Sequence, residues 1–470
     1  MSQTAVQDLP KDVLSDKISD LIASQQRYFK SGETKNLRFR VKQLQALKKA
    51  IKLNEEKLFT ALRADLGKPP LESYATEVGF LLEEINYTLK HLSTWAKPTP
   101  VTTPLTLAIS SAKVYKEPYG QTLIIAPWNY PVQLALSPLI GALAAGNTAI
   151  IKPSEFAPAT SKALAELIAG TFKPEYVAVL EGGVETNQAL LEKKFDYIFF
   201  TGSPKVGQIV MQAATRHLTP VTLELGGKSP CIVDEKYHLK NTARRIAWGK
   251  WVNCGQTCIA PDYLLVPEPE RDRLVNELKS TLEDFYGKNP AESEDYGKII
   301  NERHFDRLTH MLDQGEVVHG GQHNREQRYI APTLLLNPDL EADLMQEEIF
   351  GPLLPIVTYK TLDEAIDFVN SKSRPLALYL FTNSAKTEDH VLEHTQSGGG
   401  CVNDTLVHLA SPELPFGGIG TSGMGNYHGK RSFDTFTHER SILKKSNLID
   451  PNIRYAPYKK KLKILKWLMG

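Results

Sequence analysis

Two cysteines stand four residues apart in WVNCGQTCIAPDY, residues 251–263, in a chain that has only four cysteines. A structural zinc site needs four ligands, and Cys254 and Cys258 have no second Cys or His pair at a fitting distance, so no metal is predicted. Free cysteines most often fill a core. Gly255 and Pro261, however, favour a loop or first helical turn, where backbone N–H groups lower a thiol's pKa and bind an oxyanion. Cys258 is therefore the better nucleophile candidate, with core filling still open, and Cys254 would pack one turn behind it if the segment is helical.

An acidic residue interrupts the apolar stretch PVTLELGGKSP, residues 220–230. Burying the Glu224 carboxylate between Leu223 and Leu225 is costly, so it is either paired or a general base with a raised pKa. For a lone Glu the buried ion pair is the commoner case. The following GGKS resembles the end of a phosphate loop, but Thr222 stands where that motif requires glycine, so a phosphate loop is not predicted.

The stretch APWNYP, residues 126–131, holds Asn129 between aromatic residues and prolines. Such a stiff loop would aim the side-chain amide into the crevice at the strand ends. A positioned amide is the kind of group that stabilises a developing oxyanion. Considered alone, the loop is equally well explained by an Asn that only makes a turn.

Two glycine patterns compete as cofactor signals. FFTGSPKVGQIV, residues 199–210, combines a strand, a turn at Gly202, a potential cap at Ser203 and a following helix, so its helix N-terminus could face a pyrophosphate. PFGGIGTSGMGNYHGK satisfies G-x-G-x-x-G but has no strand before it and no obvious helix after it. It is therefore rejected as a dinucleotide fingerprint.

The elements that must position these residues alternate in type over residues 121–225. Short apolar runs, QTLIIA, NTAIIKPS, YVAVLEGG, YIFFTG and PVTLELGG, are separated by helical segments. The pattern predicts an α/β fold with a doubly wound parallel sheet, whose ligands bind at the carboxyl ends of the strands. Residues 12–97 predict a helical layer, because Leu44, Leu47, Ile51 and Leu58 recur at helical spacing. After Gly227 the runs CIVD, YLLVP, LLPIVTY and LALYLFT predict a second α/β domain.

Composition limits the classes of function. The 470 residues are 41% hydrophobic and 23% charged, as in globular enzymes of two or three domains. A net charge of +1 argues against a nucleic-acid partner. The N-terminus MSQTAVQDLPKDVLSDK lacks the cationic start and apolar run of a secretory signal, so a cytoplasmic location is expected.

Seven motifs stand in one order along the chain: PWNYP, KPSEFAP, FTGSPKVG, ELGGKSP, NCGQTC, EEIFGP and PFGGIG. This set resembles the aldehyde dehydrogenase superfamily, and NCGQTCIAPDY together with the early ADLGKPP is similar to its class 3 branch, which acts on fatty and aromatic aldehydes. The resemblance covers the chain from about residue 12 to 454. It implies a dinucleotide-binding domain at 1–100 and 121–223, a catalytic domain at 224–412, an oligomerisation segment at 101–120 and 413–446, and a tail helix at 447–470.

The resemblance implies a role for each candidate side chain. Cys258 matches the thiol that attacks the aldehyde to give a thiohemiacetal, and Asn129 with the N–H of Cys258 would hold its oxyanion. Loss of hydride to the nicotinamide then leaves a thioester, and Glu224 matches the base that activates water to hydrolyse it. The expected activity is oxidation of hydrophobic aldehydes to carboxylic acids; the alternative is a cofactor-binding or structural protein of the same fold without turnover.

The implied partners are NAD or NADP, a small aldehyde and a second copy of the chain. Residues matching the cofactor site are Trp128, Lys152, Glu155, Gly202, Ser203, Gly207, Glu348 and Phe350. A carboxylate near the ribose, as Glu155 would be, favours NAD, because a 2′-phosphate would meet like charge. Class 3 members often accept NADP as well, so the choice stays open.

The tail YKKKLKILKWLMG, residues 458–470, predicts an amphipathic helix. A helical wheel gathers on one arc Leu462, Ile464, Leu465, Leu468 and Met469, with Lys463 and Lys466 opposite. The helix is too short to span a bilayer. Docking on the body or on a dimer partner is the favoured interpretation, and the alternative is a helix that rests on an anionic membrane or covers a substrate tunnel.

Overall fold

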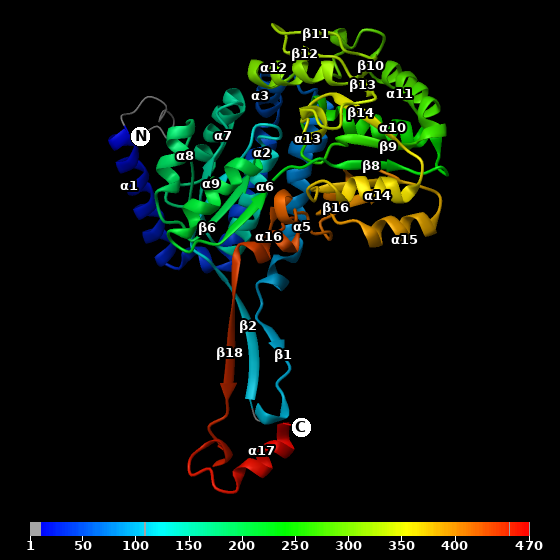
Figure 1. Ribbon diagram of the computed structural model, residues 1–470. Helices are drawn as coiled ribbons and strands as arrows, with labels where there is room; N and C mark the ends of the chain where they lie inside the picture. The colour runs from blue at the N-terminus through cyan, green and yellow to red at the C-terminus, as the bar shows by residue number, and fades with distance from the viewer. Residues whose placement is uncertain (1–10, 108–109, 451, 470) are drawn as a thin grey trace.

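The computed structural model describes residues 11–107, 110–450 and 452–469, so the first ten residues, which entered the argument about a secretory signal, lie outside it. Two α/β lobes lie side by side, and a narrow stalk of strands extends away from them (Figure 1). Within the described ranges, no helix combines the length and the apolar character needed to cross a bilayer.

The first lobe is built on a six-stranded sheet of order β17-β7-β6-β3-β4-β5. Its strands are β3 Gln121–Ile125, β4 Thr148–Lys152, β5 Val177–Val179, β6 Tyr197–Thr201, β7 Val221–Glu224 and β17 Gly423–Met424. The connecting helices are α6 Gln133–Ala145, α7 Pro158–Thr171, α8 Val184–Leu191 and α9 Pro204–Thr215. Strands β3 to β7 are parallel and fall on the five predicted runs, so the doubly wound sheet is confirmed. The antiparallel edge strand β17 comes from the glycine-rich segment and was not predicted.

Helices from the N-terminal part of the chain pack against this sheet. They are α1 Lys11–Lys30, α2 Leu37–Leu53, α3 Glu55–Leu66, α4 Pro70–Ser73, the π-helical turn η2 Tyr74–Val78 and α5 Gly79–Trp95. The side chain of Asn36 accepts the backbone N–H of Arg38 and so caps the start of α2. The apolar positions that predicted the helical layer, Leu44, Leu47, Ile51 and Leu58, are all 0% exposed, which confirms it.

The second lobe is built on a seven-stranded sheet of order β10-β13-β14-β9-β8-β15-β16. Its strands are β8 Pro230–Val233, β9 Tyr263–Pro267, β10 Glu316–His319, β13 Thr333–Leu336, β14 Leu353–Tyr359, β15 Ala377–Phe381 and β16 Gly399–Val402, and β11 His323–Asn324 pairs with β12 Tyr329–Ile330 beside it. The helices are α10 Leu239–Trp251, α11 Arg271–Tyr286, α12 Glu302–Met311, α13 Asp343–Gln346, α14 Leu362–Asn370 and α15 Ala385–His394. The four predicted runs all form strands. β16 was missed because glycine is a poor strand former, yet a Cβ on Gly400 would overlap the carbonyl oxygen of Leu378 on β15.

The stalk joins two distant parts of the chain. β2 Ser110–Pro118 pairs antiparallel with β1 Thr99–Val101 on one side and with β18 Thr437–Lys445 on the other. The segment 413–446 is therefore divided: β17 completes the first sheet, α16 Lys430–Thr435 packs on α6, and β18 belongs to the stalk.

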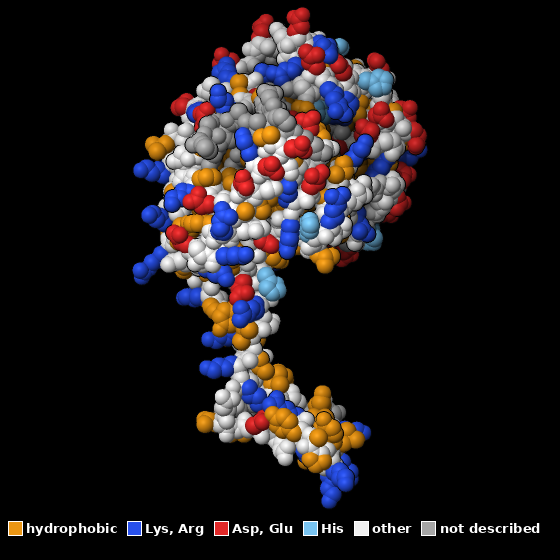
Figure 2. All heavy atoms as spheres, turned by 90° about the vertical axis from the view of Figure 1, so that its left-hand side faces the viewer, with side chains coloured by type: hydrophobic (Ala, Val, Ile, Leu, Met, Phe, Trp, Pro, Cys, Tyr) orange, Lys and Arg blue, Asp and Glu red, His pale blue; other side chains and the backbone are white. Residues whose placement is uncertain are grey.

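The tail helix α17 spans Lys461–Met469 at the far end of the stalk, beside the turn η3 Leu105–Leu107 and away from both lobes (Figure 1). Hydrophobic side chains gather there next to Lys and Arg side chains (Figure 2). Leu462, Ile464 and Leu465 are 61%, 51% and 42% exposed, whereas the side chain of Leu468 lies outside the described residues.

Candidate active site

The cysteine loop leaves α10 through a left-handed backbone, not through a helical turn. Asn253 and Cys254 have φ values of 51° and 56°, and Gly255 follows at 73°. A Cβ on Gly255 would overlap the carbonyl oxygen of Gly351, so only glycine fits there. The segment is not helical, so the condition under which Cys254 would pack one turn behind Cys258 is not met.

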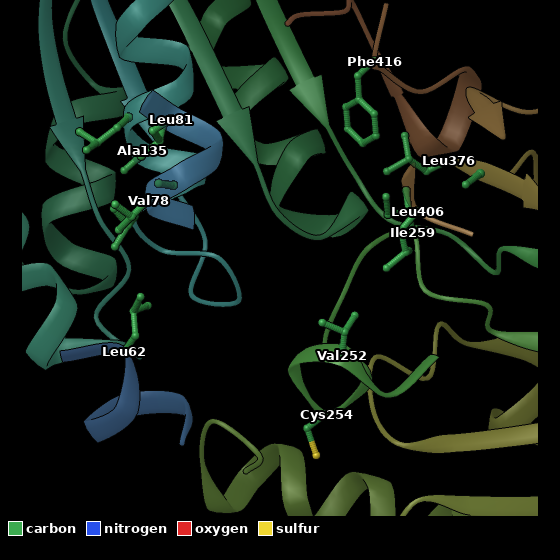
Figure 3. Close-up of a cluster of buried hydrophobic side chains, with 14 of the residues drawn as sticks. Leu62, Val78, Leu81, Ala135, Val252, Cys254, Ile259, Leu376, Leu406 and Phe416 are labelled. Atoms are coloured by element: carbon green, nitrogen blue, oxygen red, sulfur yellow. The ribbon is translucent and has the colours of Figure 1, made fainter. Parts of the chain in front are cut away.

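Cys254 is a core residue. Its side chain is fully buried, and burial raises its pKa to about 12. It lies in the interior cluster with Val252 and Ile259 (Figure 3). Cys258 is partly exposed and packs against the same cluster. The two cysteines thus differ in access to solvent, as a core residue and a reacting thiol should.

The electrostatics of Cys258 differ from the expectation that its pKa is lowered. Burial raises the pKa of the thiol, and the nearby carboxylates of Glu348 and Glu224 raise it further. Hydrogen bonds from the N–H groups of Cys258 and Ile259 act in the opposite direction but do not outweigh these causes. The backbone donors are present as predicted, and two acidic side chains that are distant in the sequence lie near the same thiol.

Glu224 ends strand β7 in the interior of the first sheet, flanked by Thr201 of β6 and Gly423 of β17. It is 2% exposed, and within the described residues neither carboxylate oxygen has a hydrogen-bond partner. Burial therefore raises its pKa well above the usual range. The buried ion pair, the commoner case for a lone Glu, is not found; the geometry is that of an unpaired carboxyl with a raised pKa.

Asn129 lies in the loop between β3 and α6 and is 3% exposed. Its backbone oxygen accepts from the side-chain amide of Asn253 at 2.8 Å and from Nζ of Lys68 at 3.3 Å. Its own side-chain amide forms no hydrogen bond with the other described residues, so the amide does not serve to make the turn. It remains able to donate to a ligand.

The cofactor candidates on the first lobe lie at the carboxyl ends of its strands. Nζ of Lys152 lies 3.2 Å from Glu155, and burial lowers the pKa of this lysine. Ser203 accepts the N–H of Val206 at 3.5 Å and so caps α9. A Cβ on Gly207 would lie 2.7 Å from Cδ2 of Leu225, so glycine allows α9 to approach the sheet.

The remaining cofactor candidates come from both lobes, and the rings of two of them lie close together. The rings of Trp128 and Phe350 are 5.2 Å apart, and His304 of α12 lies 5.0 Å from Trp128. Burial, and after it the charge of Asp262, raises the pKa of Glu348 to about 8. Within the described residues, Oε1 of Glu348 has no hydrogen-bond partner.

Sequence reasoning missed the residues that support this side of the site. Lys228 pairs with Asp262 at 2.6 Å and donates to the backbone oxygen of Glu347 at 2.8 Å. Asp262 also accepts the N–H of Ile349 at 3.0 Å, so the pair holds the EEIFGP segment in place. The sequence signal for this pair was Lys228, which directly follows two glycines in the GGKS stretch, but that stretch was considered only as a phosphate loop. His304 had no signal, because it lies alone in an ordinary helical stretch.

The residues present fit a dinucleotide. A capped helix N-terminus, a glycine-lined approach to the sheet and the orphaned oxygen of Glu348 are features that bind a pyrophosphate and a ribose. Across the described ranges, no group of three or more His, Cys, Asp or Glu side chains is arranged to hold a metal ion.

Comparison with known proteins identifies the family of the chain. The profile of the aldehyde dehydrogenase family matches residues 5–442. The 4,4′-diaponeurosporen-aldehyde dehydrogenase of Staphylococcus aureus is 51% identical over 441 residues, covering 93% of this chain and 96% of that protein. The dimeric NADP-preferring aldehyde dehydrogenase of Rattus norvegicus is 48% identical over 442 residues, covering 94% of this chain and 98% of that protein.

A solved structure described as the substrate-bound state of Staphylococcus aureus AldH superimposes with a TM-score of 0.95 at 50% identity, covering 96% of this chain and 99% of that one. Both the sequence matches and the fold extend over nearly the full length of the described residues. The chain belongs to the aldehyde dehydrogenase family and is an NAD(P)-dependent oxidoreductase that acts on aldehydes.

Proposed function

We propose that this enzyme oxidises hydrophobic aldehydes with Cys258 as nucleophile, Asn129 as oxyanion donor and Glu224 as the base of hydrolysis. The observation that carries the proposal is the buried carboxyl of Glu224, which has no hydrogen-bond partner among the described residues and lies near the partly exposed thiol of Cys258. A protein of this fold without turnover would have no reason to keep an uncompensated buried acid, which costs stability. The non-catalytic alternative is therefore not favoured.

In the first step the thiol of Cys258 loses its proton to water, its sulfur bonds to the aldehyde carbon, and the carbonyl electron pair moves to the oxygen. The side-chain amide of Asn129 and the backbone N–H of Cys258 donate hydrogen bonds to this oxyanion. NAD(P)⁺ bound at the site supplies the acceptor for the hydride and a positive ring charge. Glu224 then takes a proton from the water that attacks the resulting thioester, and the sulfur leaves as the acid forms.

We assign the cofactor to the carboxyl ends of the first sheet. The N-terminus of α9, with Gly202, Ser203 and Gly207, would hold the pyrophosphate, and Lys152 with Glu155 the adenosine ribose. Glu348 and the rings of Phe350 and Trp128 would hold the nicotinamide end. The carboxylate of Glu155 favours NAD, while the rat relative is named as NADP-preferring, so both cofactors enter the test.

Apolar side chains gather around Ile259, the residue directly after the thiol, and this supports a hydrophobic substrate. Ile259 follows Cys258 directly, and Leu406 lies beside it with Phe416 nearby (Figure 3). The Staphylococcus relative is named for 4,4′-diaponeurosporen-aldehyde. An assay of reduced-cofactor absorbance with aldehydes from C2 to C16 and both cofactors tests the proposal. Rising kcat/KM with chain length supports it, and a preference for C2 over every longer aldehyde refutes the substrate class.

The stalk and tail support two further assignments. Val101, Tyr115 and Leu443 on the stalk strands are exposed, which suits pairing with a second copy, and the rat relative is named as dimeric. A homodimer is proposed on this basis. The tail exposes Trp467 and Met469 beside several lysines, which suits peripheral contact with an anionic membrane on the cytoplasmic side.

A further inference from the structure

A buried ion pair that the reaction does not use lies directly behind the Asn129 loop. Nζ of Lys68, between α3 and α4, lies 2.5 Å from Oε1 of Glu77, and both side chains are 0% exposed. Removing two charges from water is costly, and the mutual attraction often does no more than offset that cost. The pair is therefore weak evidence for stability, and its contacts indicate another role.

Each member of the pair holds one side of the Asn129 loop. Nζ of Lys68 donates to the backbone oxygen of Asn129 at 3.3 Å and lies 4.1 Å from the centre of the Tyr130 ring. Oε2 of Glu77 accepts the N–H groups of Val132 at 2.8 Å and Gln133 at 3.1 Å, at the start of α6. One ion pair thus fixes both the loop and the first turn of the helix that follows it.

Two hydrogen bonds connect this loop to the cysteine loop. The backbone oxygen of Asn129, which receives Lys68, also receives the side-chain amide of Asn253 at 2.8 Å. The hydroxyls of Tyr130 and Thr257 are 2.6 Å apart, and Thr257 directly precedes Cys258. The ammonium of Lys68 therefore contacts the two residues, Asn129 and Tyr130, through which the loops are joined.

We propose that Lys68 is a positioning residue that sets the separation between the Asn129 amide and the Cys258 sulfur. The proposal rests on the oxyanion role assigned to Asn129 above. Oxyanion stabilisation depends on donor placement, and a shift of about 1 Å costs on the order of 10²-fold in rate. Lys68 touches no substrate in this proposal; it acts through the loop.

Lys68→Met should lower kcat for aldehyde oxidation about 10- to 100-fold while KM for the aldehyde and the Kd for NAD change less than about threefold. Alkylation of Cys258 by iodoacetamide, which forms no oxyanion, should keep its rate.

Arg40→Met is the matched control, because Arg40 is a buried cation bonded to the backbone oxygens of Thr34 and Ala144, away from the cysteine loop. It should lower Tm but not kcat. An equal loss of kcat in the two variants, or an equal loss of alkylation and oxidation in Lys68→Met, overturns the proposal.

A double-mutant cycle with Asn129→Ala separates positioning from general damage. If Lys68 acts through Asn129, Lys68→Met costs little further activity in the Asn129→Ala background. If the fold-losses of kcat in the two single variants multiply in the double variant, the positioning role is overturned, but the oxyanion role of Asn129 remains. An Asn129→Ala enzyme with full activity would instead remove the oxyanion role, and the positioning proposal with it.

Tyr130→Phe repeats the cycle with a variant that keeps its buried ring. It removes only the hydroxyl that contacts Thr257, so the fold should persist even if Lys68→Met does not fold. The expected loss is about 3- to 10-fold in kcat, again absent in the Asn129→Ala background. Two combinations of results overturn the proposal, because each leaves no link between the loops. In the first, kcat is unchanged in Tyr130→Phe and the activity losses of Lys68→Met and Asn129→Ala multiply. In the second, kcat is unchanged in Tyr130→Phe and Lys68→Met does not fold.

Discussion

Gly226 faces the carboxylate of Glu348 with no room for a side chain: a Cβ built there would overlap Oε2 and lie 2.6 Å from Cδ. Gly226→Ala must therefore push Glu348 away from its place opposite the first sheet. If Glu348 holds the nicotinamide ribose, its displacement loses a contact worth about 1.4 kcal/mol, so KM for NAD should rise about tenfold. Titration of NAD in the absorbance assay measures this KM.

The control for this substitution is Gly170→Ala on α7, where a Cβ meets nothing within 4 Å. It should leave KM unchanged and stabilise the protein by about 0.5–1 kcal/mol, because alanine restricts the unfolded chain. A Gly226→Ala enzyme with unaltered KM would show that Glu348 does not contact the cofactor.

Substitution of the two cysteines should have different effects on activity and stability. Cys258→Ala should abolish aldehyde oxidation while cofactor binding, followed by fluorescence quenching, persists. Cys254→Ala should keep most activity and lose about 1–2 kcal/mol of stability in thermal unfolding, because it leaves a small cavity in a fully buried site. The reverse pattern of activities would exchange the roles of the two thiols.

Glu224→Gln should form the acyl-enzyme and then stall. The amide cannot accept a proton from water, so pre-steady-state traces should show a burst of reduced cofactor and a steady-state rate at least about 10²-fold lower. Stopped-flow absorbance at high enzyme concentration measures both phases. Equal loss of burst and steady state would place Glu224 in acylation and not in hydrolysis.

Glu348 should make stability depend on pH. Its folded-state pKa of about 8 lies above the usual value of 4.5, so between these two values the folded protein keeps a proton that the unfolded chain has lost. The free energy of unfolding should therefore fall as pH rises from 4.5 to 8 and level off above 8. Subtracting the same curve for Glu348→Gln, measured by urea titration, isolates this contribution. A difference that stays flat across this window would contradict the assignment.

The tail can be tested by truncation after Pro457. Loss of α17 should reduce binding to anionic liposomes in flotation assays, because its exposed apolar side chains and lysines are removed together. Binding to neutral liposomes serves as the reference. If liposome binding and chain-length preference are both unchanged while the dimer dissociates, the tail is a dimer contact only.

Patterns of residue type were sufficient for much of the fold. Strands β3 to β7 follow β-branched and apolar runs. The loops of Asn129 and Cys258 are joined by hydrogen bonds, and Glu224 lies near the thiol. What could not be predicted depends on contacts between distant segments. The left-handed backbone at Asn253 accompanies its hydrogen bond to the Asn129 loop. The raised pKa of Cys258 follows first from burial and then from two acidic side chains, 34 and 90 positions away in the sequence.

The Lys68–Glu77 pair could not be found for the same reason. Lys68 and Asn129 meet across 61 positions, and no local spacing reports such an approach. The strand β17 was hidden in another way: its glycines match a well-known cofactor pattern, but their space is used for close packing, as at Gly423 against the backbone of Leu223.

The ladder between β2 and β18 also constrains the order in which the protein can be completed. Ser110 on β2 pairs with Lys445 on β18, so the ribosome must synthesise the chain as far as residue 445 before the stalk can form completely. Until then β2 has an unpaired edge, which is a template for association with other chains. We therefore expect newly made chains to need protection at this hairpin, and the last strand to determine when a subunit is ready to assemble.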